Sequence, residues 1–382
     1  MNTEIQKLTS TTLRNCLDIT PNIREFLASE SMDEDVDERV LEKLFCELPR
    51  LTALDFCAAT GSSFKSGVIK VISPENPLLP ATLPIQRFGM HGCRTLPSSV
   101  FSTLLHRLPQ LTHLDLTHTQ VTDETLHIIP HTARLTHLSL SKCNRLTGSA
   151  VVDFLTNHPA TQDLVYLNLL YDTSTYRLLS AADVDSLLPL LPTTLRSLNL
   201  SGAQINWTHL PELRALSRHL EELSIGYADL SIQDLNSLLG QDEPEGDAAS
   251  SPPRSTLRYL DLTGVSSIKP SSLIDIKRCK LLLPCSLPLQ VLELSEKVTD
   301  VLQGQRIPTK ELGWNVKSPH RRAWYVRSGS ATVAGGEHIA KALAEETGAR
   351  TWKMGGKLWG GRKVGMAEGE VSGIYGYYGY GY

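Results

Sequence analysis

One short apolar pattern, LxxLxL, recurs along most of the chain and organises it. Ten copies begin 24 to 37 residues apart, at Ile23, Leu51, Ile85, Leu111, Leu135, Leu164, Leu195, Leu220, Leu257 and Leu289. Recurrence at a nearly regular interval is typical of stacked repeats rather than of one compact core. We therefore expect each copy to be a short strand whose apolar residues turn inward while the residues between them face solvent.

The residues that follow each strand change to helical spacing. In the copy that begins at Leu135, Val151, Val152 and Leu155 form an apolar helix face, and the residues around Pro159 end it. The same spacing predicts helices in residues 40–48, 100–108, 124–129, 184–191, 211–216 and 232–239. One strand and one helix per repeat predict an α/β solenoid, a horseshoe with a parallel sheet on its concave side and helices outside.

A second recurrent position lies eight residues after each copy begins and is mostly small. Its occupants are Ser31, Ala59, Cys93, Thr119, Cys143, Ala203, Ala228 and Val265. With these corner residues and the phrases VTDETL (121–126) and LTGSAV (146–151), the chain resembles the cysteine-containing leucine-rich repeats of the ribonuclease-inhibitor-like superfamily, familiar from F-box proteins. The resemblance covers about residues 20–300 and implies a protein-binding leucine-rich-repeat solenoid.

The pattern divides the chain into three parts. Residues 1–22 are expected to form an N-terminal helix or a truncated repeat, and residues 23–300 form the solenoid. Two stretches rich in Pro, Gly, Ser or acidic residues, 65–84 and 241–254, are expected to be loop insertions. No F-box-like segment precedes the repeats, so a minimal helical cap and a chain truncated at its start both remain open.

Residues 301–382 differ in composition from the rest. They carry a net charge of +6 and four of the five tryptophans, whereas residues 1–300 carry −10. They are similar to the C-terminal block of leucine-rich-repeat proteins of filamentous fungi at Trp352, Lys353, Gly355, Trp359, Gly360, Arg362, Lys363, Glu370 and Tyr375. We expect this less regular region to dock on the acidic repeats; a partner-binding tail and nucleic-acid binding are alternatives.

Several function classes lack their signatures. The seven cysteines are scattered without a CxxC pair, which favours free thiols over disulfides or a zinc site. No signal peptide and no membrane-length apolar run is found, so we expect a cytoplasmic or nuclear protein. GxSxG, GxxxxGK[ST] and HExxH are absent, and Ser62–Lys65 matches SxxK without an accompanying base. We expect no enzyme activity, no cofactor and no small-molecule substrate.

Two places could be mistaken for metal sites. The acidic run Asp33–Glu38 lacks the glycine and glutamate of a calcium loop and is expected to cap the following helix. His113 and His137 occupy the same place in adjacent repeats, so their side chains should lie about 5 Å apart, near Asp115 and His118. A polar solvated surface is preferred over a bound metal ion.

The predicted function lies in the concave strip between the strand leucines. Its residues are Arg87, His113, Asp115, His137, Tyr166, Asn168, Arg196, Asn199, Glu222, Tyr227, Tyr259, Asp261 and Glu293. Aromatic residues and arginine carry much of the energy at interfaces, so Tyr166, Arg196, Tyr259 and Arg87 rank first. The sequence predicts a scaffold for a protein partner; the alternative is the substrate-recognition subunit of a cullin-type ubiquitin ligase.

Overall fold

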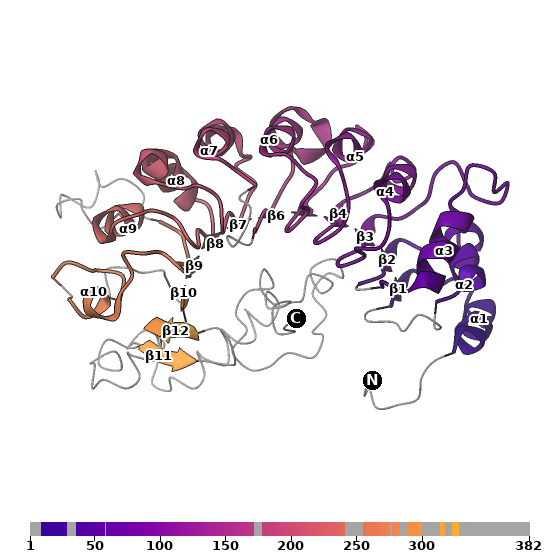
Figure 1. The fold of residues 1–382 in the computed structure, drawn as a ribbon, viewed down its shortest axis with the longest axis horizontal. Helices are drawn as coiled ribbons and strands as arrows, with labels where there is room; N and C mark the ends of the chain where they lie inside the picture. Colours follow the sequence, from indigo (N-terminus) through magenta and orange to yellow (C-terminus); the bar gives the residue numbers. More distant parts are fainter. Residues whose placement is uncertain are drawn as a thin grey trace. The chain divides into compact units, whose positions relative to one another are not determined.

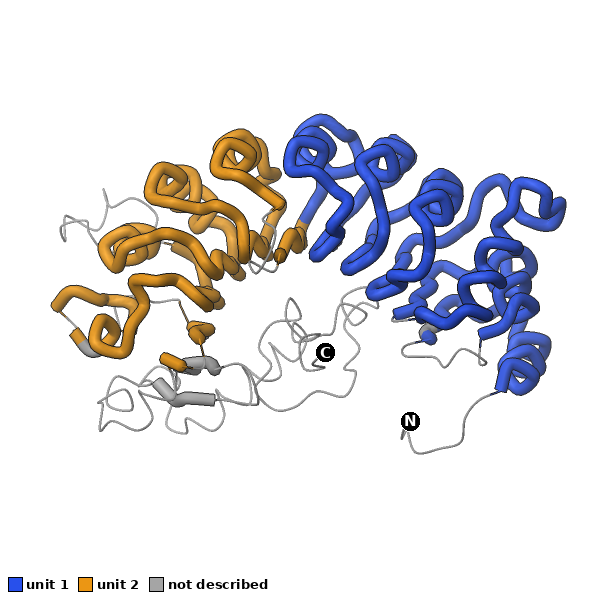
Figure 2. Tube along the Cα trace, viewed as in Figure 1, with its two compact units in different colours: residues 1–164 blue, residues 165–382 orange. Residues whose placement is uncertain are grey.

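The computed structural model describes residues 9–28, 36–57, 59–171, 178–240, 255–275, 277–282, 289, 291–295, 297–298, 314–317 and 323–327. The chain divides into two compact units, Met1–Leu164 and Val165–Tyr382 (Figure 2). Each unit is described by itself below.

Unit 1 alternates short strands with helices. Its strands are β1 (Glu25–Leu27), β2 (Ala53–Asp55), β3 (Arg87–Gly89), β4 (His113–Asp115) and β5 (His137–Ser139). Its helices are α1 (Ser10–Ile19), α2 (Glu38–Glu42) with the π-helix η1 (Lys43–Glu47), α3 (Ser62–Val71), α4 (Ser98–Leu105), α5 (Asp123–His127), α6 (Gly148–Asn157) and the 3-10 turn η2 (Pro159–Thr161). The strands lie in chain order, and each strand from β1 to β5 pairs in parallel with the next. Helices α4 to α6 lie on one side of the unit and the strands on the other (Figure 1).

Unit 2 repeats the same plan. Its strands are β6 (Tyr166–Asn168), β7 (Ser197–Asn199), β8 (Glu222–Ser224), β9 (Tyr259–Asp261) and β10 (Val291–Leu294), all parallel. Its helices are α7 (Ala181–Leu187) with η3 (Leu188–Leu190), η4 (Trp207–His209), α8 (Leu210–Ser217), α9 (Ile232–Leu238) and α10 (Pro270–Ile274). Two further strands, β11 (Trp314–Lys317) and β12 (Ala323–Arg327), pair antiparallel, and β12 pairs antiparallel with β10.

The inward leucines form the core of both units, as the pattern predicts. From the copy at Leu51 onward the fourth residue, such as Leu114 and Leu138 in unit 1 or Leu198 and Leu223 in unit 2, is 0% exposed. These residues lie opposite one another in successive strands, so each repeat covers the apolar face of the next. Burying one leucine side chain contributes about 2 kcal/mol. The α/β leucine-rich-repeat solenoid is therefore confirmed as the fold.

Polar residues at the helix starts set where each repeat turns from loop to helix. Ser180 and Ser231 each form a capping box with the aspartate three residues later. In unit 1 the carboxylate of Asp37 accepts a hydrogen bond of 2.9 Å from Val40 N and begins α2. This bears out the capping role expected of the acidic run, whose residues 33–35 lie outside the described residues.

One predicted insertion is shorter than the sequence suggested. Residues 65–71 belong to α3, because Phe64, Val68 and Val71 are spaced to form one buried helix face. The irregular stretch begins only after this helix, where the prolines start. The second insertion, 241–254, lies outside the described residues.

The N-terminal end of the solenoid agrees with the prediction from the sequence. The helix expected in residues 1–22 is α1, and the weakest copy, at Ile23, forms strand β1. Among the described residues, no helix is both long enough and apolar enough to span a membrane.

Candidate partner-binding surface

The side chains at the third and fifth positions of each copy lie on the sheet face opposite the buried fourth residue, because side chains alternate along a strand. We call this face of each unit its open face. Counting the first apolar residue of a copy as position one, the third positions include Arg87, His113 and His137 in unit 1. The predicted concave strip corresponds largely to these two positions.

In unit 1 the third positions form an ordered row of half-buried side chains. The imidazole rings of His113 and His137 are stacked, with centroids 4.1 Å apart and planes 7° from parallel. Their Nδ1 atoms hydrogen-bond to the hydroxyls of Thr112 and Thr136 at 2.9 and 3.0 Å. The prediction that the two histidines lie side by side is confirmed.

Arg87 begins the same row and is held by an ion pair. Its Nη2 lies 2.6 Å from Glu25 Oε1, and the two side chains are 20% and 24% exposed. Burial, together with the charge of Arg87, lowers the pKa of His113 to about 4. The imidazole of His113 is therefore neutral near pH 7 and offers hydrogen bonds rather than charge.

The fifth positions are structural, which corrects the prediction for four residues. Asp115, Asn168, Asn199 and Asp261 are only 0 to 3% exposed, so they do not face solvent. The Oδ1 atom of each accepts a hydrogen bond from the backbone N–H two residues later, at 2.8 to 3.1 Å. These side chains close the turn that ends each strand.

In unit 2 the remaining open-face candidates are also buried. Tyr166, Glu222, Tyr259 and Glu293 are 1 to 4% exposed, against the expectation that they face solvent. Adjacent strands lie about 5 Å apart, so long side chains in neighbouring strands lie against one another. The Tyr259 hydroxyl donates to the Glu293 carboxylate.

Serine hydroxyls, which the sequence analysis missed, complete this buried network. Ser197 Oγ donates to Glu222 Oε2 at 2.6 Å. Ser224 Oγ and Ser201 Oγ donate to Asp261 Oδ2 at 2.6 and 3.2 Å. For Ser201 a sequence signal existed, because Ser or Thr recurs at the seventh position of several copies, as in Thr117, Ser141, Ser201, Thr263 and Ser295.

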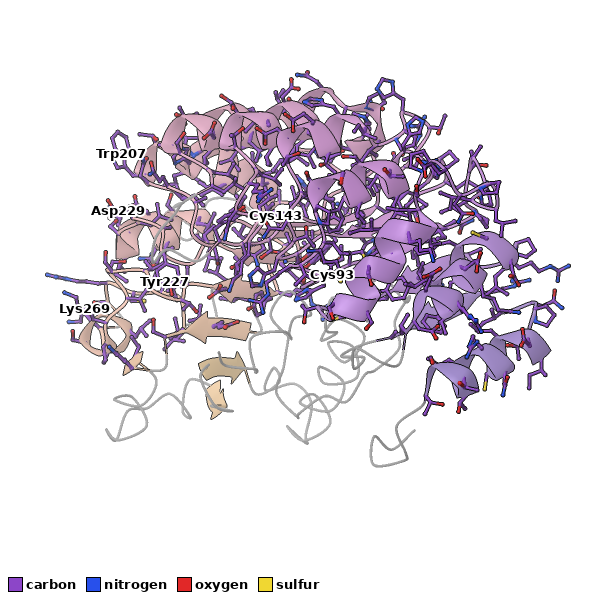
Figure 3. All side chains as sticks on the ribbon, turned by 45° about the vertical axis from the view of Figure 1, so that its right-hand side comes forward. Cys93, Cys143, Trp207, Tyr227, Asp229 and Lys269 are labelled. Atoms are coloured by element: carbon purple, nitrogen blue, oxygen red, sulfur yellow. The ribbon has the colours of Figure 1, made fainter. Side chains whose placement is uncertain are left out.

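Two predicted residues of unit 2 are exposed. Arg196 lies at the start of β7, and its Nη1 donates to the carbonyls of Thr193 and Leu195 at 2.8 and 3.0 Å. Tyr227 (Figure 3) is 42% exposed, and its ring lies against Gly264, where an added Cβ would come within 2.4 Å of the ring. Both side chains are thus oriented by their own chain.

The eighth position of each copy, which directly precedes the small corner residue, has an unusual backbone that the sequence analysis missed. Six residues at this position have a positive φ of 56 to 89°, and they are Gly92, His118, Lys142, Gly202, Tyr227 and Gly264. This left-handed conformation suits glycine and costs other residues roughly 1 to 2 kcal/mol. The glycines at three of these positions were the available signal in the sequence.

The corner cysteines have a structural role. Cys93 and Cys143 are fully buried within unit 1 (Figure 3), and their thiols donate to the carbonyls of Phe56 and Leu116 at 3.0 and 2.9 Å. Burial raises the pKa of Cys143 to about 12 and also raises that of Cys93, so neither forms a thiolate near neutral pH. Among the described residues, no group of three or more His, Cys, Asp or Glu is placed to hold a metal ion.

Comparisons with known proteins agree with the repeat. A leucine-rich-repeat family model matches residues 108–125. The chain is 38% identical over 175 residues to an F-box protein of Saccharomyces cerevisiae, a match that covers 43% of this chain but only 22% of that protein.

Solved structures with similarity include the leucine-rich-repeat-containing protein LegL7 of Legionella pneumophila, at 17% identity and a TM-score of 0.40, covering 77% of this chain and 80% of that one. Another is yeast Rad7 in complex with Elc1, at 14% identity and a TM-score of 0.37, covering 77% and 85%. From its recurrent pattern and its parallel strands, the chain has a leucine-rich-repeat fold, and over part of its length it is similar to a yeast F-box protein.

Proposed function

We propose that this protein is a scaffold that binds a protein partner on the open face of its strands. The observation that carries the proposal is the row in unit 1, where Arg87, His113 and His137 stand in register on three consecutive parallel strands. All three side chains are half-buried, so each has both a fixed position and an accessible part.

This row suits a protein surface because its side chains are already ordered. The histidine rings are stacked and tethered to threonine hydroxyls, and the guanidinium of Arg87 is paired with Glu25. Side chains that are ordered before binding lose little conformational entropy when a partner docks. The neutral imidazole of His113 beside the guanidinium of Arg87 favours a polar segment that can exchange hydrogen bonds.

Unit 2 offers fewer accessible candidates, Arg196 and Tyr227. Arginine and tyrosine are enriched among residues that dominate binding energy at interfaces. The buried residues of the predicted strip, among them Tyr166 and Tyr259, are expected to stabilise unit 2 instead.

Affinity purification of the full chain from its source cells tests the proposal, with one variant for each unit. His113→Ala combined with His137→Ala is expected to reduce partner recovery at least fivefold, and Arg196→Glu with Tyr227→Ala to reduce it less. Trp207→Ala combined with Leu190→Ser is the control, because these side chains are 69% and 62% exposed on the helical side of unit 2. Unchanged recovery by both variants, with folding verified by circular dichroism, would contradict the proposal.

A second candidate is a substrate-recognition subunit of a cullin-type ubiquitin ligase. The identity of 38% over 175 residues to a yeast F-box protein favours it. If it is correct, a cullin co-purifies with the chain, and the partner identified above becomes more long-lived in cells that lack the chain. A partner whose ubiquitylation and half-life do not depend on the chain would leave the scaffold alone as the function.

A further inference from the structure

The third strand positions of unit 2 are more deeply buried than the same positions of unit 1. In unit 2 they lie in register on four consecutive strands, β6 to β9, and are only 1 to 6% exposed. These residues are Tyr166, Ser197, Glu222 and Tyr259. In unit 1 the side chain of Arg87 is 20% exposed, and His113 and His137 are half-buried. The same place in the repeat therefore has a different environment in the two units.

Neighbouring strands do not account for this burial by themselves. Side chains stand roughly perpendicular to a sheet, so residues on adjacent strands cover their flanks and leave their outer ends open. The residue opposite Tyr166 on β7 is Ser197, whose side chain is too short to cover a tyrosine ring. Helices α7 to α9 lie on the other side of the strands (Figure 1), where the fourth-position leucines are buried. The 1% exposure of Tyr166 thus indicates a further layer over the open face.

The open face of unit 2 combines carboxylates with aromatic rings. Glu222, Asp261 and Glu293 are 2 to 4% exposed and accept hydrogen bonds from hydroxyl groups. A buried carboxylate is stable when it is hydrogen-bonded and also lies near positive charge. The rings of Tyr166 and Tyr259 suit contact with indole rings or guanidinium groups. The face therefore fits an occupant that carries both cations and tryptophans.

One segment of this chain has that composition. Residues 350–363 read RTWKMGGKLWGGRK and contain five Lys or Arg, two Trp and neither Asp nor Glu. The other residues that follow β12, 328–349 and 364–382, contain one Lys, no Arg and five Glu. The positive charge of the C-terminal region is thus concentrated where its last two tryptophans lie.

The segment can reach the open face of unit 2. Strand β12 pairs antiparallel with β10, and Val326 lies opposite Val291, so the chain leaves the sheet beside β10. Residues 328–349 connect β12 to the segment, and such a connection spans at most about 75 Å when fully extended. The distance from β10 to β6 is four strand spacings, or roughly 20 Å.

We propose that residues 350–363 bind to the open face of unit 2, over strands β6 to β9. The cations of the segment lie against the carboxylates of Glu222 and Asp261, and its tryptophans contact the tyrosine rings. The proposal does not depend on the proposed function, which concerns the row in unit 1. It accounts for the small number of accessible open-face residues in unit 2.

Photocrosslinking on the full chain tests where the segment binds. The photoreactive residue p-benzoylphenylalanine replaces Trp352 or Trp359, one position at a time, and the cross-linked residues are identified by mass spectrometry. Cross-links are expected within one chain, to open-face residues of β6 to β9. The same probe in place of Trp207 is the matched control, because Trp207 is 69% exposed and lies in η4, outside the strands. It is expected to give none of these cross-links.

A cysteine reporter measures whether the segment covers the face. Ser197→Cys places a thiol on the open face of β7, and mass spectrometry follows its labelling by a water-soluble maleimide. Adding Lys353→Glu, Lys357→Glu and Arg362→Glu is expected to raise the labelling rate at least tenfold, because like charges then repel the segment from the carboxylates.

A control variant carries the same change of charge elsewhere in unit 2. Lys269→Glu, Lys277→Glu and Arg218→Glu alter three exposed residues outside the strands and are expected to leave labelling slow. Circular dichroism verifies that both charge variants are folded. The cross-linking result decides the matter if the segment variant is unstable, since it leaves the charges of the segment unchanged.

Several outcomes would overturn the proposal. These are cross-links only to helices, to unit 1 or between two chains, and a labelling rate that is the same in the segment variant and in the control variant. The proposed function fails independently. If His113→Ala with His137→Ala still recovers the partner while the cross-links fall on β6 to β9, the intramolecular site stands and the unit 1 row does not. If that variant loses the partner and the cross-links fall elsewhere, the reverse holds.

Discussion

The strands of the two units pair in the same parallel register, but the polar residues on their open faces differ in how far they are buried. In unit 1 the third positions carry Arg87, His113 and His137, which are half-buried and tethered at one edge. In unit 2 the third and fifth positions carry tyrosine, serine and carboxylates that are almost wholly buried and bond mainly to one another.

The difference teaches that an outward strand position in a leucine-rich repeat is not automatically a binding position. A polar side chain on the open face is accessible only when side chains on the adjacent strands neither cover it nor occupy its hydrogen-bonding groups. Unit 2 uses the positions for internal hydrogen bonds, which stabilise the stack. In unit 1 the side chains of Arg87, His113 and His137 remain partly accessible.

The largest expected effect tests whether the apolar cores of the two units are equally sensitive to a buried charge, although their open faces differ. Leu138→Asp in unit 1 and Leu198→Asp in unit 2 each place a carboxylate at a position that is 0% exposed. Each is expected to cost more than about 4 kcal/mol and to abolish cooperative unfolding of its unit, because an unpaired buried charge is strongly unfavourable. Urea unfolding followed by circular dichroism measures this, and a mild effect in one unit only would show that the cores differ as well.

The next prediction compares the loss of stability when the fifth-position aspartate is removed in each unit. Asp261 accepts hydrogen bonds from Thr263 N, Ser224 Oγ and Ser201 Oγ. Asp261→Ala is expected to reduce the free energy of unfolding by about 3 kcal/mol, since it leaves buried donors without an acceptor. Asp115→Ala in unit 1 is expected to reduce the free energy of unfolding by about 1 to 2 kcal/mol, because it removes the hydrogen bond that Asp115 Oδ1 accepts from Thr117 N.

A control variant isolates the reason for this difference. Asp261→Asn retains an oxygen for the turn, as Asn199 does at the same position of its repeat, and is expected to recover about half of the loss. Equal costs for Asp261→Ala and Asp115→Ala in urea titrations would argue against a special network in unit 2.

The smallest effect is a pH dependence to which the histidines of unit 1 contribute most. The pKa values of His113 and His118 are lowered to about 4, whereas an unfolded histidine titrates near 6.5. Between these values the unfolded chain binds more protons, so stability falls as the pH drops from about 6.5 to about 4. His113→Gln is expected to reduce this loss by about 1 to 2 kcal/mol, allowing for solvent screening of a half-buried group.

Arg87→Gln provides the matched check on the cause. It removes the second contribution to the lowered pKa of His113 while leaving burial in place, so NMR titration is expected to show a partial rise toward 6.5. If His113 titrates at the same pH in the wild type and in this variant, the charge of Arg87 does not act on the histidine row.

Much of the fold was predictable because the same apolar pattern recurs in every copy of the repeat. The leucine triplets predicted every parallel strand from β1 to β10, and helical spacing predicted α2 and α4 to α9 within a few residues of their observed bounds. The helix α3 was missed, because the prolines that follow it favoured a loop over residues 65–84 although Phe64, Val68 and Val71 have helical spacing.

The candidate site was predicted less well. The stacking of His113 on His137 followed from one shared position in neighbouring repeats. The exposure of Tyr166, Glu222, Tyr259 and Glu293 was wrong, because alternation along a strand specifies a face but not what covers it.

The sequence by itself determined the strand-and-helix repeat, the inward leucines and the small buried corners, because each depends on residues close together in the chain and on a period that recurs. Only the tertiary structure decided which open-face residues are buried and that Ser224 and Ser201 meet Asp261. These contacts join residues 23 to 60 positions apart, and the distance between their side chains is set by the stacking of repeats rather than by any local pattern.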